Sequence, residues 1–90
     1  MKMYLISDNV DTLIGMRLAG VDGVVVHEKD ELRTAIETAM EDKTVGIILL
    51  TEKFGREFPE LLDEIKLERT MPLLIEIPDR HGTGRKKDFI

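Results

Sequence analysis

The most constraining feature of this sequence is the uninterrupted apolar run at residues 45–50, which reads VGIILL. A strand with one face in water alternates apolar and polar side chains, and this run does not alternate. Such a run is typical of a strand that is covered on both faces, as in a parallel sheet with helices on each side. The sequence therefore predicts an α/β domain built around this strand.

Three other segments have the composition of strands. Residues 23–27 include three consecutive valines, and β-branched side chains suit a pleated strand. Residues 3–7 and 71–77 are short apolar runs bounded by turn residues or prolines. Pro72 falls at the start of the last run, where a missing backbone N–H is tolerated. We therefore expect four strands in all.

The segment after the first strand has the apolar spacing of a helix. Its apolar residues recur at offsets of 0, 3, 4, 8 and 11, which places them on one helical face. The members of this predicted buried face are Val10, Leu13, Ile14, Leu18 and Val21. Gly20 is expected to end the helix. Gly15 lies inside it and costs up to ~1 kcal/mol relative to alanine, which we expect close packing of the helix backbone on the sheet to offset.

Polar residues mark where the three predicted helices begin. Asp8, Asn9 and Asp11 place acceptors near the first helix N-terminus, which needs them. Asp30 is expected to cap the second helix and Thr51 the third. The second helix has the clearest amphipathic pattern. Its predicted buried face consists of Leu32, Ala35, Ile36, Ala39 and Met40.

Pro59 interrupts the apolar pattern of the third helix, so a kink or a restart is expected there. The inner face of that helix is predicted to consist of Phe54, Phe58, Leu61, Leu62 and Ile65. Strands and helices thus alternate in the order βαβαβαβ. Right-handed crossovers with alternate winding then predict a small Rossmann- or flavodoxin-like domain, with a four-stranded parallel sheet of order 2-1-3-4 and helices on both faces.

The length of 90 residues fits one domain. We assign residues 1–78 to the α/β domain and residues 79–90 to a basic tail, expected to be flexible unless something binds it. Apolar residues make up 42% and charged residues 34%, which indicates a globular chain, and the net charge of −5 argues against nucleic acid as a partner. The chain has no cysteine, and its longest apolar run is far shorter than the ~20 residues that a membrane span needs.

Ligands of open parallel sheets bind where the strand order reverses, at the carboxyl ends of the strands. Here that point lies between the first and third strands. The candidates that follow these strands are Ser7, Asp8, Asn9, Thr51 and Glu52. They are consistent with a pocket for a small molecule or a metal, but also with helix capping, which all these residue types do well. Capping is the interpretation we favour.

Asp8 and Asp11, as paired acids after the first strand, resemble part of the metal pocket of receiver domains. A receiver also needs an aspartate after the third strand, and this chain has Thr51 and Glu52 there. No phosphate-binding glycine motif follows the first strand, and the histidines at 27 and 81 lack the spacing of metal ligands. We therefore expect no catalytic residues, no metal and no cofactor.

Three segments together resemble the F subunit of the V/A-type rotary ATPases. Residues 15–21, GMRLAGV, are similar to the G-F-R-L-A-G-I stretch of that family's first helix. Residues 45–52, VGIILLTE, resemble its third strand and the threonine-glutamate that follows. Residues 72–78, PLLIEIP, resemble its last strand. The resemblance runs from residue 3 to about residue 88 in the same order.

This resemblance implies a non-catalytic rotor-stalk component of an ATP synthase or ATPase, cytoplasmic and peripheral to the membrane. It implies binding to the helical hairpin of the D subunit and to other stalk subunits, in support of coupling between ATP turnover and hydrogen ion transport. Many members carry a regulatory C-terminal helix after a glycine-arginine loop. In this chain residues 84–90, GRKKDFI, resemble only the lead-in to that helix.

The residues expected at the partner interface are Arg17, Thr51, Glu52, Arg80 and Arg85. Two alternatives stay open at this point. One is a stand-alone receiver-like or flavodoxin-like domain that regulates or binds a ligand through the residues at the strand ends. The other is a regulator that forms dimers through the exposed edge strand at residues 23–27.

Overall fold

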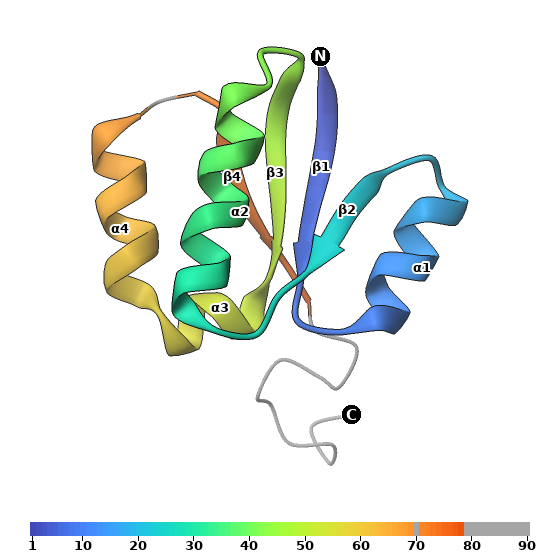
Figure 1. Ribbon diagram of the computed structural model, residues 1–90, viewed down its shortest axis with the longest axis horizontal. Helices are drawn as coiled ribbons and strands as arrows, with labels where there is room; N and C mark the ends of the chain where they lie inside the picture. Colours follow the sequence, from blue (N-terminus) through green and yellow to red (C-terminus); the bar gives the residue numbers. More distant parts are fainter. Residues whose placement is uncertain (70, 79–90) are drawn as a thin grey trace.

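The computed structural model describes residues 1–69 and 71–78, which form a four-stranded parallel sheet with helices on both faces (Figure 1). The strands are β1 (Lys2–Ser7), β2 (Asp22–Val25), β3 (Val45–Thr51) and β4 (Leu73–Ile77). Their order in the sheet is β2-β1-β3-β4, so the predicted fold class and strand order are confirmed.

The apolar run that forms β3 occupies the middle of the sheet. β3 pairs in parallel with β1 on one side and with β4 on the other. Ile48 and Leu50 are fully buried on one face, and Leu49 is 8% exposed on the other. Coverage of both faces explains why the side chains of this strand do not alternate between apolar and polar, as the sequence pattern predicted.

The helices are α1 (Val10–Leu18), α2 (Lys29–Glu41), α3 (Glu52–Glu57) and α4 (Pro59–Glu68). The break between α3 and α4 confirms the predicted restart, with Pro59 in the first turn of α4. Proline has no N–H to lose at that position, and its fixed φ already suits a helix. No helix in the described residues is long and apolar enough to cross a membrane.

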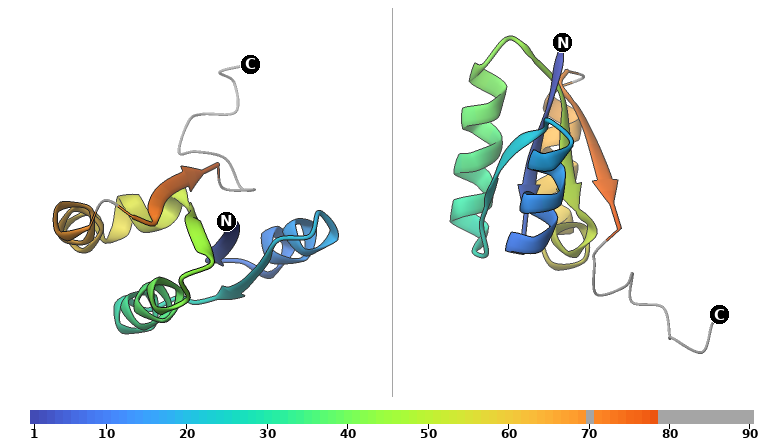
Figure 2. Two further views of the ribbon diagram at one scale, coloured as in Figure 1. Left: turned by 90° about the horizontal axis from the view of Figure 1, so that it is seen from above. Right: turned by 90° about the vertical axis from the view of Figure 1, so that its right-hand side faces the viewer.

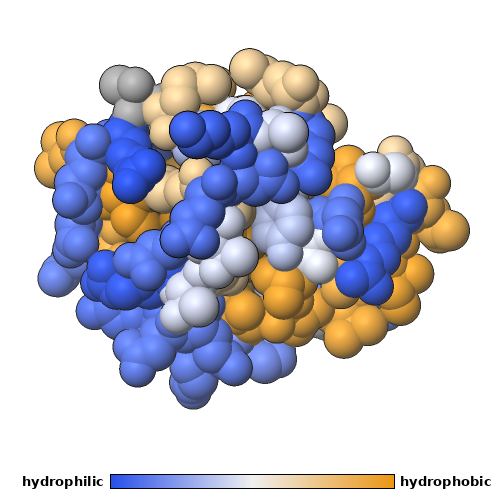
Figure 3. Space-filling model, turned by 45° about the horizontal axis from the view of Figure 1, so that its top comes forward, coloured by the Kyte–Doolittle hydropathy of each residue, from blue (hydrophilic) through white to orange (hydrophobic). Residues whose placement is uncertain are grey.

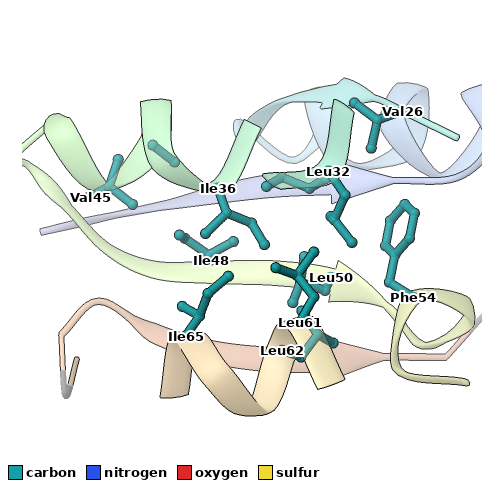
Figure 4. Close-up of a cluster of buried hydrophobic side chains, with 12 residues drawn as sticks. Val26, Leu32, Ile36, Val45, Ile48, Leu50, Phe54, Leu61, Leu62 and Ile65 are labelled. Atoms are coloured by element: carbon teal, nitrogen blue, oxygen red, sulfur yellow. The ribbon is translucent and has the colours of Figure 1, made fainter. Parts of the chain in front are cut away.

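Two views show how unequally the two faces are covered. α2 and α4 lie on one face of the sheet, and α1 lies alone on the other (Figure 2). The larger core therefore forms beneath α2 and α4, where Ile36, Ile48 and Leu61 are at most 1% exposed (Figure 4). The smaller core beneath α1 contains Leu5, Leu13 and Leu49. Because α1 covers its face of the sheet only in part, Leu73 and Ile75 of β4 are 50% and 42% exposed.

The predicted inner face of α1 is wrong at three of its five positions. Leu13 is buried, with Met16 packed beside it, but Val10, Ile14 and Leu18 are 57%, 51% and 86% exposed. The helix rests on the sheet along the line of Leu13 and Met16, which rotates the other apolar residues outward. Apolar spacing predicts which side of a helix faces the core only when the apolar residues form a single stripe. α1 has apolar residues on two sides, so its spacing does not decide between them.

The expected reason for Gly15 is also wrong. A Cβ atom built at this position would meet no heavy atom within 4 Å, since Gly15 faces away from the sheet. Close packing of α1 on the strands therefore does not explain this glycine. In contrast, Gly20 has a φ of 90° and ends α1 as predicted. Beside it, the Val21 N–H donates to Met16 O at 2.9 Å, a pattern typical of a helix ended by glycine.

Two predicted helix caps need correction. The cap of α2 is Glu28 and not Asp30, because the Glu31 carboxylate accepts hydrogen bonds from the N–H groups of His27 and Glu28 at 2.9 Å. Because the Glu31 side chain reaches back over the first turn to these N–H groups, the helix begins at Lys29, one residue before Asp30. Thr51 does precede α3, but its hydroxyl makes no capping bond to that helix.

Candidate functional site

The carboxyl ends of β1 and β3 meet, as predicted, and their polar side chains bond to each other and to the backbone. Ser7 and Thr51 are both fully buried. Thr51 Oγ1 accepts a hydrogen bond from the Asp8 N–H at 3.1 Å. Ser7 Oγ donates to Asn9 O at 2.8 Å and accepts from the Asn9 N–H at 3.0 Å. Both hydroxyls therefore serve to hold the turn after β1 against the end of β3.

Asn9 caps α1. Its Oδ1 accepts a hydrogen bond from the Thr12 N–H at 2.8 Å, and its Nδ2 donates to Asp8 Oδ1 at 3.3 Å. This satisfies one of the N–H groups that a helix start leaves without an intrahelical partner. The capping interpretation of Asn9 is therefore confirmed.

Asp8 is the most enclosed carboxylate at this end of the sheet, with a side chain only 8% exposed. Lys53 Nζ lies 4.0 Å from its Oδ2 and 3.9 Å from Glu57 Oε2. Lys53 thus lies between two carboxylates and offsets part of their charge. The described residues contain no group of three histidines, cysteines or acids placed to hold a metal ion.

Of the residues predicted at a partner interface, the three that the structure describes lie on different elements. Arg17 lies on α1, where its Nε is 3.4 Å from Asp22 Oδ1 and its guanidinium donates to Gly23 O at 3.4 Å. Glu52 begins α3 and pairs with Arg56 at 3.4 Å, while Thr51 is buried beneath it. Arg80 and Arg85 lie outside the described residues, as do His81 and the basic tail predicted at 79–90.

Within residues 1–69 and 71–78, three carboxyl or hydroxyl groups have perturbed pKa values, those of Asp42, Glu31 and Tyr4. Hydrogen bonds from the Thr44 hydroxyl and N–H, with Lys2 nearby, lower the pKa of Asp42 to about 2. The N–H groups of Glu28 and His27 lower the pKa of Glu31, and burial raises the pKa of Tyr4. None of the three belongs to the polar group at the carboxyl ends of β1 and β3, and Asp42 lies instead beside the amino ends of these strands, 3.3 Å from Lys2 Nζ.

Comparison with known proteins places the sequence of this domain in one protein family. A model of the family described as ATP synthase (F/14-kDa) subunit matches residues 3–90, nearly the whole chain. The chain belongs to this ATP synthase family. The α/β domain described above is therefore the fold of a member of this F-subunit family.

Curated relatives of the F-subunit family agree with this assignment. The chain is 38% identical to the F subunit of the A-type ATP synthase of Methanothermobacter thermautotrophicus, over 86% of this chain and 73% of the relative. It is 34% identical to that of Pyrococcus furiosus, over 100% of this chain and 86% of the relative. For Methanocaldococcus jannaschii the identity is 31%, over 98% and 85%.

This member of the F-subunit family has an exposed apolar surface on α1 that was not predicted from the sequence. Val10, Ile14 and Leu18 line the outer side of α1, and we call these three residues the α1 ridge. Hydrophobic side chains gather over α1 on the right of Figure 3, whereas the surface over α2 is mostly hydrophilic. Met16 is the signal that could have revealed this ridge, because it gives Leu13 a partner on a second, inward side of the helix.

Proposed function

We propose that this chain is a non-catalytic component of the central stalk of an A-type ATP synthase. The family match across residues 3–90 is the observation that carries the proposal, because it covers all of the domain's helices and strands except Lys2, the first residue of β1. Curated relatives are named as F subunits of such enzymes. A component of a complex works through its surface, so association with other ATPase subunits follows from the assignment.

The specific partner in this proposal is the long helical hairpin of the D subunit. In this role the α/β domain is a rigid body that turns with the stalk and supports coupling of ATP synthesis or hydrolysis to hydrogen ion transport. The internal bonding of Ser7, Asn9 and Thr51 supports a role without chemistry of its own, because those groups stabilise the fold at the position where related folds bind ligands. Such a stalk component is cytoplasmic and peripheral to the membrane.

Arg17, Glu52, Arg80 and Arg85 remain the proposed contact residues of this interface, and Thr51 remains part of it in a supporting role. Among them, Arg17 has a side chain that is 57% exposed. Thr51 is fully buried, so its contribution in this proposal is to hold α1 and α3 in place rather than to touch the partner.

A binding titration tests this proposal directly. The full 90-residue chain is mixed with the purified D-subunit hairpin of an A-type ATP synthase, and the Kd is measured by titration calorimetry. A stable one-to-one complex is expected, and an unrelated α-helical hairpin of similar charge is the control. No association at micromolar concentrations, or equal association with the control hairpin, contradicts the proposal.

A further inference from the structure

β2 forms one free edge of the sheet, because it pairs with β1 alone. The Val26 N–H donates to Ser7 O on β1 at 2.9 Å. Backbone groups of successive residues in a strand point to opposite sides, so those of Gly23 and Val25 point away from β1. A free edge of this kind can pair with the main chain of another extended segment.

Side chains of the domain itself already occupy part of this edge. The Gly23 N–H donates to Asp22 Oδ1 at 2.8 Å, and Gly23 O accepts a hydrogen bond from the Arg17 guanidinium at 3.4 Å. The outward N–H and C=O of Val25 have no such partner among the described residues. A full strand is therefore kept from adding to β2, and a short extended segment can pair with Val25 alone.

A groove of about 570 Å³ runs beside this edge, between β2 and α2, and we call it the edge groove. Its walls are formed by Tyr4, Val24, Val25 and Val26 from the sheet and by Thr34, Ala35 and Thr38 from α2. The side chains of an extended segment point alternately to the two faces of a sheet. Every second side chain of a segment that pairs with Val25 therefore enters the edge groove, where apolar groups and two threonine hydroxyls meet it.

Both charged side chains among the described residues of the edge groove are carboxylates. Asp30 and Glu31 line its end in the first turn of α2. Glu31 Oε1 is already bonded, because it accepts from the N–H groups of His27 and Glu28 at 2.9 Å. Asp30 is exposed and forms no hydrogen bond or ion pair with the described residues. Its carboxylate is therefore available to a cation of the occupant.

We propose that the edge groove binds a short extended peptide segment that carries a lysine or an arginine. Val25 bonds the main chain of the segment, the groove takes its alternate side chains, and Asp30 pairs with its cation. This is peptide binding by strand addition, in which main-chain bonds supply affinity and side-chain pockets supply specificity. The site is independent of the D-subunit hairpin, because a helix uses its own main-chain groups and has none to offer Val25.

Selection from a display library of random heptapeptides tests the edge groove on the full chain. Wild type is expected to enrich peptides in which a lysine or arginine stands among β-branched residues. An enriched peptide is then synthesised with a fluorophore, and its Kd is measured by anisotropy. Failure to enrich any sequence, or enrichment of sequences without a basic residue, overturns the proposal.

Two matched acid variants separate the site from general attraction to an acidic protein. Asp30 and Asp63 are both exposed, and Asp63 lies on α4, away from the groove lining. Changing either to asparagine alters the net charge equally. We expect Asp30→Asn to weaken binding of the synthesised peptide about threefold or more, as loss of an ion pair does, and Asp63→Asn to leave the Kd almost unchanged. Equal effects of the two variants mean that only net charge acts, and the proposal is then wrong.

The main-chain bond to Val25 is tested separately. Val25→Pro removes the outward N–H and leaves the neighbouring bonds to β1, and an edge strand tolerates proline on its free side. Loss of binding by about tenfold is expected, with circular dichroism to confirm folding. Amide hydrogen exchange of wild type gives a second measurement: the synthesised peptide is expected to slow exchange at Val25, and unchanged exchange with bound peptide overturns the proposal. If wild type is a dimer by solution scattering that Val25→Pro converts to a monomer, the edge belongs to a second copy and the inference is wrong.

Discussion

The backbone N–H of Asp8 donates a hydrogen bond to Thr51 Oγ1 at 3.1 Å, across 43 residues of sequence. This bond joins the end of β1 to the end of β3, the two strands between which the sheet reverses its order. Thr51 is fully buried, so water cannot replace the hydroxyl if it is removed. The residue that the sequence indicated as a helix cap thus acts as a tie between strands.

Replacement of Thr51 by valine tests this tie. Valine keeps the shape of the side chain but leaves the Asp8 N–H without its acceptor, which is expected to lower the free energy of unfolding by about 1–3 kcal/mol. Urea denaturation monitored by circular dichroism measures the change. Thr51→Ser keeps the hydroxyl and is expected to lose less. A Thr51→Val variant as stable as wild type contradicts this role.

Gly23 is required by the close approach of β2 to β1. A Cβ atom there would collide with Leu5 O and lie 2.7 Å from Leu5 Cβ, and neither of these atoms can move without the strand. Gly23→Ala is therefore expected to destabilise the domain by about 1–3 kcal/mol, as overpacking does. Thermal unfolding measures the effect. An unchanged melting temperature would show that β2 shifts freely and that the predicted strain is absent.

The two glycines of the first helical segment are expected to respond in opposite directions. Gly15→Ala adds a methyl group in open space and should stabilise the isolated chain by up to about 1 kcal/mol. Gly20 has a φ of 90°, so Gly20→Ala should destabilise it by about 1 kcal/mol or more. Both are measured by urea denaturation under one condition. Shifts of the same sign in the two variants would refute this prediction.

Asp42 gives the domain a pH dependence at acidic pH. Hydrogen bonds from Thr44 and the nearby Lys2 lower its pKa to about 2 from an ordinary value of 3.8. A lowered folded-state pKa means that the stabilisation is complete above about pH 4 and is lost as pH falls towards 2. Asp42→Asn should therefore reduce the melting temperature at pH 7.

The same variant carries its own control. The difference in melting temperature between Asp42→Asn and wild type should shrink between pH 4 and pH 2, because the wild-type carboxylate becomes protonated there. A difference that stays constant over this range would mean that the Asp42 charge does not stabilise the fold.

The sequence by itself determined the fold class, the strand order and the family. The fold class and strand order follow from local patterns: the unbroken apolar β3, the valines of β2 and the break at Pro59 each depend on neighbouring residues in the chain. The family follows from the resemblance of three segments to the F subunit. Handedness rules then leave few ways to arrange four parallel strands. The cap at Asn9 and the stop at Gly20 could be predicted for the same reason, since both are contacts within a few residues.

Only the tertiary structure decided which side of α1 faces the sheet and what Thr51 and Glu31 bind. Val10, Ile14 and Leu18 have the same spacing whether they point inward or outward, and the choice depends on how Leu13 and Met16 fit against β1 and β3. Likewise, Thr51 finds its partner 43 residues away. Contacts between distant segments settle such choices, because they depend on the shape of the whole packed domain and not on periodicity along the chain.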